Sequence, residues 1–138
     1  MLINYRKAKN YKKKLGYLGE KIAISLLKKK NYRIHIHNYN NPKGEIDIIA
    51  QDGLTLCFIE VKTRRKKDKW KPADNLKLKQ MKRIFNSSMS YLKQINNPNI
   101  PVRYDLIEII YNKFDVQDVK HHTNFFSQST LKNKTYQG

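Results

Sequence analysis

Apolar residues fall into two short runs, at residues 46–50 and 54–61, on either side of the pair Asp52-Gly53. Both runs are rich in β-branched and large apolar side chains, which favour strands. An Asp-Gly pair between two such runs is the strongest short-range signal for a tight hairpin. The pattern therefore predicts two antiparallel strands joined by a two-residue loop.

Three ionisable residues interrupt the apolar pattern of this hairpin. With the Asp-Gly pair as the loop, Asp47 lies opposite Phe58 and is the diagonal neighbour of Glu60. Side chains alternate between the faces of a strand, so Asp47, Glu60 and Lys62 emerge on the same face. Their neighbours on both faces are apolar, so both faces should be covered. Acids on a covered face are costly unless they pair or bind a metal ion. A simple salt bridge between Lys62 and Glu60 is the alternative to a metal site.

A helical pattern precedes the hairpin over residues 15–30, where apolar residues recur every three or four positions. Glu20 falls on the apolar side of this helix, together with the small residues Gly16, Gly19 and Ala23. Small residues let a helix approach a sheet closely, despite the cost of glycine to the helix. Close approach would bring Glu20 to the acids of the hairpin. The alternative is that Glu20 interacts only with the helix dipole or a nearby lysine.

The same reasoning places the other elements. Alternation over residues 32–39 predicts a strand before the hairpin, and residues 102–111 form a third long apolar strand. A helix is expected over residues 74–95, and a short edge strand over residues 114–120. Residues 121–138 are polar without periodicity, which predicts a loosely ordered tail that carries no chemistry. The apolar, inward stripe of the second helix consists of Leu78, Met81, Phe85, Met89 and Leu92.

Composition indicates a polyanionic partner. The 138 residues include 29 Lys and Arg against 11 Asp and Glu, a net charge of +18. Such an excess attracts nucleic acid, ribosomes or anionic membrane. A general bias of the source toward lysine would account for part of it. Residues 1–14 form a basic extension, either helical or a mobile arm, that would place positive charge on a phosphate backbone.

A second basic run follows the hairpin directly, at residues 64–71. Such a run is usually a solvated loop. Its position just after Lys62 also makes it a candidate clamp for substrate phosphates, with Trp70 able to stack on an exposed base. The start of the next helix adds polar residues on the same side. The expected nucleic-acid-binding residues are Arg64, Arg65, Lys66, Lys67, Lys69, Trp70, Lys79, Gln80 and Lys82.

The sequence also bounds the cellular context. Cys57 is the single cysteine, which rules out an internal disulfide and suits a reducing cytoplasm. No apolar run is long enough to span a membrane, and the N-terminus lacks the apolar run of a secretory signal. The length fits one domain, expected over residues 1–120. We therefore expect a cytoplasmic protein without a membrane partner.

Four short motifs carry a resemblance to a known family. They are Gly16-x-x-Gly19-Glu20, Gly44-Glu45-Ile46-Asp47, Ile59-Glu60-Val61-Lys62-x-Arg64 and Arg103-Tyr104-Asp105. In this order, over about residues 10–120, the chain resembles the YraN-like family of small bacterial proteins. Asp47 with Glu60 and Lys62 also resembles the D…(E/D)-x-K signature of the restriction-endonuclease-like nucleases, a group that includes archaeal Holliday junction resolvases. The resemblance implies an α/β fold with a restriction-endonuclease-like core, a central mixed β-sheet flanked by helices.

The function that the resemblance implies is metal-dependent hydrolysis of phosphodiester bonds in nucleic acid. DNA is favoured over RNA, and branched DNA is a candidate substrate. Asp47, Glu60 and the backbone carbonyl of Val61 would ligate Mg²⁺ or Mn²⁺, and Glu20 would bind through water or a second ion. Lys62 would lie beside the attacking water. The expected catalytic residues are therefore Glu20, Asp47, Glu60 and Lys62.

A function of a different class remains open. The rival is a non-catalytic basic protein that binds nucleic acid or ribosomes on a nuclease-like fold, with steep salt dependence and no need for a divalent ion. A binding protein would do better to lose acids that face phosphate, so the intact set of two acids and a lysine favours the nuclease. Related nucleases often dimerise, which allows a homodimer, but no residue identifies a dimer face.

Overall fold

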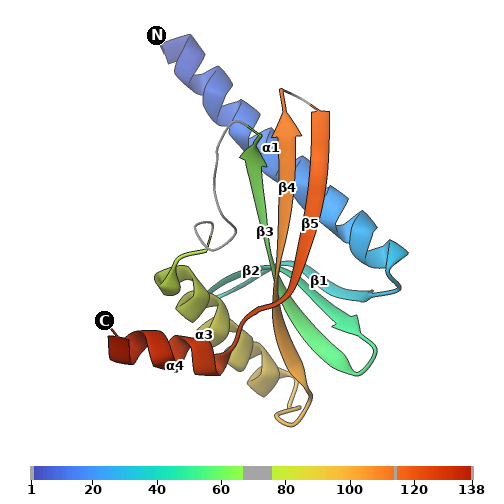
Figure 1. Cartoon of the computed structure of the whole chain (residues 1–138), viewed down its shortest axis with the longest axis vertical. Helices are drawn as coiled ribbons and strands as arrows, with labels where there is room; N and C mark the ends of the chain where they lie inside the picture. Colours follow the sequence, from blue (N-terminus) through green and yellow to red (C-terminus); the bar gives the residue numbers. More distant parts are fainter. Residues whose placement is uncertain (1, 67–75, 114, 138) are drawn as a thin grey trace.

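Within the described residues, five strands form one mixed sheet with helices on both faces (Figure 1). The computed structural model describes residues 2–66, 76–113 and 115–137. The strand order is β1-β2-β3-β4-β5, with β3 and β4 parallel and the other neighbours antiparallel. This confirms the expected α/β class with a restriction-endonuclease-like core. The elements are α1 (Leu2–Lys29), β1 (Arg33–Asn41), β2 (Gly44–Asp52), β3 (Thr55–Arg65), α3 (Leu78–Gln94), β4 (Val102–Asn112), β5 (Asp115–Phe126) and α4 (Gln128–Gln137).

Two apolar clusters hold the helices to the sheet, one on each face. On the α1 face, Ala23 and Leu27 pack on the strand residues Ile48 and Ile59. On the opposite face, α3 lies against the sheet with α4 beside it (Figure 1), and Phe58 is among the fully buried residues there. Alternate side chains of the β2–β3 hairpin thus enter different cores. The expectation that both faces of this hairpin are covered is confirmed.

The loop of the β2–β3 hairpin is Gly53-Leu54, because Asp52 already pairs with Thr55. The expected loop, Asp52-Gly53, is wrong by one residue, which shifts the strand pairing by two. Gly53 has φ 59°, and a positive φ at the first loop position is typical of a type II′ turn. A shift by two residues leaves every side chain on its expected face. The predicted face of Asp47 therefore survives the error.

Helix α1 begins at Leu2, so the basic extension takes the helical form, one of the two that the sequence allowed. A Cβ added at Gly19 would lie 2.6 Å from Oγ1 of Thr63 on β3, whereas at Gly16 it would meet nothing within 4 Å. Gly19 therefore permits the close approach that the sequence predicts, and Gly16 does not contribute to it. In the part of the chain that the structure describes, no helix is both long and apolar enough to cross a membrane.

Helix α3 begins at Leu78, later than expected, and buries a slightly different stripe. Met81 is buried as predicted, but Met89 is 48% exposed and is not a core residue. Ser88 is buried instead, and its hydroxyl lies 2.6 Å from that of Tyr104. A buried hydrogen-bonded serine cannot be recognised from an apolar pattern, which is why the expected stripe was wrong at this turn.

The C-terminal segment is regular structure and not a loosely ordered tail. Strand β5 continues to Phe126, past the expected end of the edge strand at Lys120, and helix α4 follows. Phe126 and Leu131 are buried in the cluster on the α3 face. These two apolar residues hold an otherwise polar segment against the core. Two isolated apolar residues produce no periodic pattern, so the sequence did not reveal this segment as regular structure.

A buried carboxylate on β4 anchors the end of the sheet nearest the hairpin loop. Asp105 is 1% exposed and receives two hydrogen bonds from Arg103, one from His121 and one from the Asn124 N–H, each at 2.9 Å. Burial alone would raise the pKa of Asp105, but the bonds from His121 and Arg103 outweigh it and the net pKa is lowered. Asp105 is therefore held in its charged form.

Arg103 extends this network to two other elements. Its Nη1 lies 3.0 Å from Oδ2 of Asp52 at the end of β2, and its Nη2 donates to the Tyr32 hydroxyl at 2.7 Å. The hydrogen bond to Asp105 is the largest of the effects that raise the pKa of Arg103. The guanidinium thus ties the start of β1 and the end of β2 to β4.

Candidate active site

Strands β2 and β3 separate at Asp47. Phe58 pairs with Ile49, so the expected pairing of Asp47 with Phe58 is wrong, and the backbone ladder ends one pair further on. Beyond that point, Oδ2 of Asp47 accepts a hydrogen bond from the Val61 N–H at 2.8 Å. The carboxylate therefore lies between the strands at their fork and is fixed by the backbone of β3.

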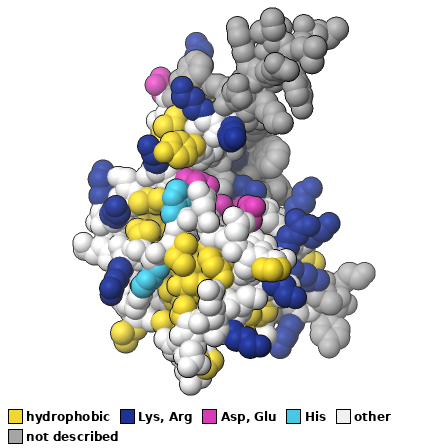
Figure 2. All heavy atoms as spheres, turned by 180° about the vertical axis from the view of Figure 1, so that it is seen from behind, with side chains coloured by type: hydrophobic (Ala, Val, Ile, Leu, Met, Phe, Trp, Pro, Cys, Tyr) yellow, Lys and Arg dark blue, Asp and Glu magenta, His cyan; other side chains and the backbone are white. Residues whose placement is uncertain are grey.

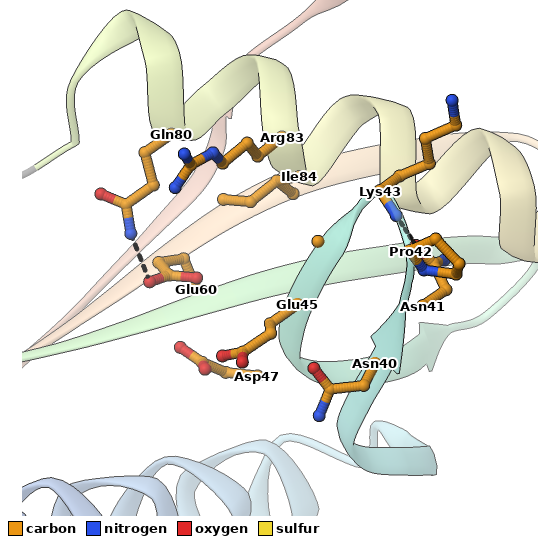
Figure 3. A pocket seen from close by; sticks show the side chains of 11 residues that line it. Asn40, Asn41, Pro42, Lys43, Glu45, Asp47, Glu60, Gln80, Arg83 and Ile84 are labelled. Carbon is orange, nitrogen blue, oxygen red and sulfur yellow. Dashed lines mark hydrogen bonds between the residues drawn. The ribbon is translucent and has the colours of Figure 1, made fainter.

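The other two residues of the predicted set lie beside Asp47. The carboxyl groups of Asp47 and Glu60 are within hydrogen-bonding reach of each other. Nζ of Lys62 lies 3.6 Å from Oε1 of Glu60, and Gln80 on α3 donates to the same oxygen at 2.8 Å (Figure 3). The alternation along the strands thus correctly predicted that two acids and a lysine converge on one face.

The two acids cannot both be charged without cost. Burial, and then the charge of Asp47, raise the pKa of Glu60 to about 8. Burial also raises the pKa of Asp47, and the nearby charge of Glu20 adds to the effect, while the hydrogen bond from the Val61 N–H lowers it. At neutral pH the isolated pair therefore retains a proton, and Lys62 only partly offsets the repulsion.

Glu20 approaches the fork from α1, on the other side of the sheet. Its Oε2 lies 2.9 Å from Nε2 of His37 on β1, and its charge acts on Asp47. The approach of α1 thus places Glu20 where its charge acts on Asp47, while its carboxylate pairs with His37. His37 was not expected in the site; the only signal in the sequence is its position in the alternating residues of β1.

The donor set suits a divalent cation with oxygen ligands. Burial raises the pKa of both partly buried carboxyl groups, and the charge of Asp47 raises that of Glu60 further, so a cation bound between them would relieve the cost of ionising the pair. The bond between Asp47 and the Val61 N–H also fixes the backbone next to the expected carbonyl ligand. Among residues 2–66, 76–113 and 115–137, no group of three or more His, Cys, Asp or Glu side chains is arranged to hold a metal ion. The part assigned to Glu20 in metal binding therefore stays a prediction.

A cavity of about 570 Å³ opens beside the two acids. Figure 3 shows its position between the turn that joins β1 to β2 and helix α3. Acidic side chains lie at the fork end, and Arg83 lines the cavity from α3. The residues that line it are Asn40, Asn41, Pro42, Lys43, Gly44, Glu45, Asp47, Glu60, Gln80, Arg83 and Ile84.

Comparison with known proteins identifies the family. A model of the uncharacterised protein family UPF0102 matches residues 19–109. The chain belongs to UPF0102. This is the YraN-like family that the four sequence motifs indicated. The match contains all four motifs except residues 16–18 of the first.

Relatives of this UPF0102 chain align over most of their length. A UPF0102 protein of Chlorobium limicola is 40% identical over 109 residues, which cover 79% of this chain and 84% of the relative. One from Chlorobaculum tepidum is 41% identical over 108 residues, covering 78% and 84%. One from Clostridium perfringens is 35% identical over 121 residues, covering 88% and 97%. These names state a family and no activity.

The residues expected to bind nucleic acid divide into four groups in this UPF0102 protein. Arg64 has a side chain only 12% exposed, with Nε 3.0 Å from Oε2 of the buried Glu108, so its guanidinium supports the sheet. Gln80 binds Glu60 and belongs to the acid cluster. The side chains of Arg65, Lys66, Lys79 and Lys82 are exposed, and Lys67, Lys69 and Trp70 lie outside the described residues.

The surface around the fork has mixed charge. Figure 2 shows acidic side chains and a histidine gathered in a hollow, with lysine and arginine side chains on the surrounding surface. A nucleic acid strand would be attracted by the surrounding cations, while its approach to the acids requires that their charge be neutralised. A cation or protons at the acid pair would lower the repulsion between the acids and the strand.

Proposed function

We propose that this UPF0102 protein is a metal-dependent endonuclease that hydrolyses phosphodiester bonds in nucleic acid, with DNA favoured over RNA. The observation that carries the proposal is the convergence of Asp47, Glu60 and Lys62 at the open fork between β2 and β3. A purely structural salt bridge would need only one acid and one cation. The second, partly buried acid raises the cost of the cluster, and a bound divalent ion would offset that cost.

Each residue has a distinct part in this proposal. Asp47, Glu60 and the Val61 carbonyl would hold Mg²⁺ or Mn²⁺, which supplies Lewis-acid chemistry and acidifies water when bound. Lys62 places a positive charge where negative charge develops on the phosphate. Gln80 fixes one oxygen of Glu60 and so orients the carboxylate. Glu20, positioned by His37, adds a third negative charge near Asp47.

The rival function is binding of nucleic acid or ribosomes without cleavage. The net charge of +18 supports both functions equally. The acids distinguish them: a site that only binds phosphate gains nothing from acids at its centre, because they repel the ligand. The acid cluster therefore favours hydrolysis over simple binding.

Cleavage assays with Mg²⁺ or Mn²⁺ test the proposal directly. Wild-type protein would be compared with Asp47→Asn and Lys62→Ala on single-stranded, duplex, flapped and branched DNA. Asp118→Asn and Lys93→Ala remove the same charges at exposed positions and serve as matched controls. We expect each site variant to lose about a hundredfold or more in rate, while the controls keep wild-type activity. Chelation of the metal should abolish cleavage.

Two results would decide against hydrolysis at this site. Cleavage that survives both Asp47→Asn and Lys62→Ala would place the catalyst elsewhere. Tight binding to every substrate, unaffected by divalent ions and without cleavage, would favour the binding function instead.

A further inference from the structure

We propose that the cavity beside the acid pair receives one unpaired nucleotide, so that the preferred substrate is a single strand or an unpaired segment of a branched molecule. This inference rests on the proposed function, because it takes the acid pair as the position of the phosphate to be cleaved. It adds a substrate class and a binding site that the acids alone do not define.

Position is the first argument. Asp47 and Glu60 line one end of the cavity, and the turn between β1 and β2 lines the other. A strand whose phosphate lies at the acids can therefore place one neighbouring nucleotide in the cavity. At about 570 Å³, the cavity falls within the range of about 300–1,000 Å³ that is usual for small-molecule sites.

The far wall of the cavity is held in place by hydrogen bonds to α3. The side-chain amide of Asn41 donates to the Ser87 carbonyl at 3.1 Å, and its Oδ1 accepts from the Lys43 N–H at 2.8 Å. The Ser87 hydroxyl in turn donates to the Gly44 carbonyl at 3.3 Å. Ser87 is fully buried. The turn therefore cannot move independently of the helix, and the cavity is preformed.

Gly44 is part of this wall of the cavity. Its φ is +154°, a conformation that side chains disfavour. A Cβ there would lie 3.4 Å from the carbonyl oxygen of Arg83. The turn therefore lies within van der Waals reach of the α3 backbone, and the φ of Gly44 constrains a side chain there more than the available space does.

The lining matches the chemistry of a nucleotide. Ile84 lines the cavity but is itself buried, so the accessible lining is mainly polar, and Asn40 contributes an exposed amide. Within the described ranges of the chain, Arg83 has no ion-pair partner although acids line the same cavity. Amide and guanidinium groups are the side chains that most often bind base edges, and guanidinium also binds phosphate. Arg83 is therefore available to a ligand.

Pairing decides which nucleic acids can use this cavity. A base inside a duplex is stacked and hydrogen-bonded to its partner, so it enters a pocket only after it is extruded, at a cost of a few kcal/mol. A base in a single strand, a flap or a junction crossover carries little of this cost. The cavity should therefore favour unpaired over paired DNA at equal backbone charge.

A binding experiment isolates the cavity from catalysis. The Asp47→Asn protein, in buffer without divalent ions and at one fixed salt concentration, would be titrated into a labelled single strand and into a blunt duplex of the same sequence. Arg83→Ala would be added to this background and compared with Lys93→Ala, which removes the same charge from an exposed position near the other end of α3.

We expect Arg83→Ala to weaken binding to the single strand about tenfold, the loss of one charged hydrogen bond, and binding to the duplex by less than about threefold. Lys93→Ala should weaken both equally and slightly. Equal losses on both DNAs for the two variants would overturn the inference, since Arg83 would then act only through net charge. A circular dichroism spectrum identical to that of the parent protein confirms that each variant is folded.

The fate of the inference can be separated from that of the proposed function. If the single strand binds through Arg83 but wild-type protein with Mg²⁺ cuts nothing, nucleotide binding in the cavity is supported and the proposed nuclease activity is refuted. If wild-type protein cuts blunt duplex as fast as single strand at internal positions, the nuclease activity is supported and the assignment of the cavity to an unpaired nucleotide is refuted.

Discussion

Glu60→Gln offers a test of the acid pair that does not depend on any substrate. The change keeps the size of the side chain and an oxygen that can accept from Gln80, and it replaces the repulsive carboxylate with an amide that can donate to Asp47. We expect the variant to be more stable than wild-type protein at alkaline pH in the absence of metal. A residue that served only to stabilise the fold would behave in the opposite way.

The expected magnitude follows from the pKa of Glu60. An unfolded chain loses this proton near pH 4.5, whereas the folded protein holds it up to about pH 8. Between these values the folded state binds more protons, so the free energy of unfolding falls as the pH rises. One pKa unit corresponds to about 1.4 kcal/mol, which sets an upper limit of about 5 kcal/mol on the loss. Glu60→Gln should remove this loss and leave stability near pH 4 unchanged.

Urea unfolding followed by circular dichroism measures this effect. Wild-type and variant proteins would be compared in a chelating buffer across the window from about pH 4 to 9. The matched control is Glu45→Gln, an exposed acid in the same cavity, which should change the free energy of unfolding by less than about 0.5 kcal/mol at every pH.

Repeating the experiment with Mg²⁺ should reverse the difference, because the metal is expected to stabilise wild-type protein more than the variant. Mg²⁺ that binds only the folded state stabilises it, so wild-type protein should regain stability at alkaline pH while Glu60→Gln gains little. If the variant is instead less stable than wild-type protein above pH 8 in chelator, the two carboxyl groups do not repel each other in the folded state. The electrostatic argument for a cation at the fork would then be refuted.

Three further predictions concern packing, charge and salt. Removing the guanidinium in Arg103→Ala leaves Asp105 charged in a buried position, so we expect thermal unfolding to show a loss of about 3–5 kcal/mol, with Arg103→Lys recovering only part of it because it cannot bind both oxygens. Gly16→Ala should stabilise α1 by up to about 1 kcal/mol, whereas Gly19→Ala should destabilise the protein because its methyl group meets Thr63; equal effects in urea unfolding would contradict the close approach of α1. Binding to duplex DNA should weaken by an order of magnitude or more between low and physiological salt, as a linear dependence in a log–log plot.

The sequence predicted the hairpin faces better than the hairpin register. Alternation has a period of two, so an error of two residues in pairing does not move Asp47 to the other face. The choice of Gly53-Leu54 over Asp52-Gly53 as the loop depends on a single positive φ. Side-chain identity constrains that choice weakly, because Asp-Gly and Gly-x are both favourable hairpin loops.

Long-range polar pairs were the least predictable features. His37 reaches Glu20 across two elements, and His121 reaches Asp105 from the segment expected to be a tail. The local sequence around each histidine does not predict its hydrogen-bond partner. The same is true of the buried Ser88, whose hydroxyl donates to the Phe85 carbonyl and also pairs with the Tyr104 hydroxyl. Periodicity reports apolar burial, whereas polar pairing fixes the positions of these three residues, of which His37 is exposed.

The four sequence motifs prove to have two different physical roles. Asp47, Glu60 and Lys62 converge at the fork, and the charge of Glu20 acts on Asp47 from α1, so charge there is only partly compensated. The motif that begins at Arg103 lies beside the start of β3, away from the fork. Within the described residues, the guanidinium of Arg103 pairs with the carboxylates of both Asp105 and Asp52. A matched network stabilises the sheet, whereas an unmatched one costs stability and is useful only when a ligand completes it. Substitutions at Arg103 should therefore change stability first, and substitutions at the fork should change function first.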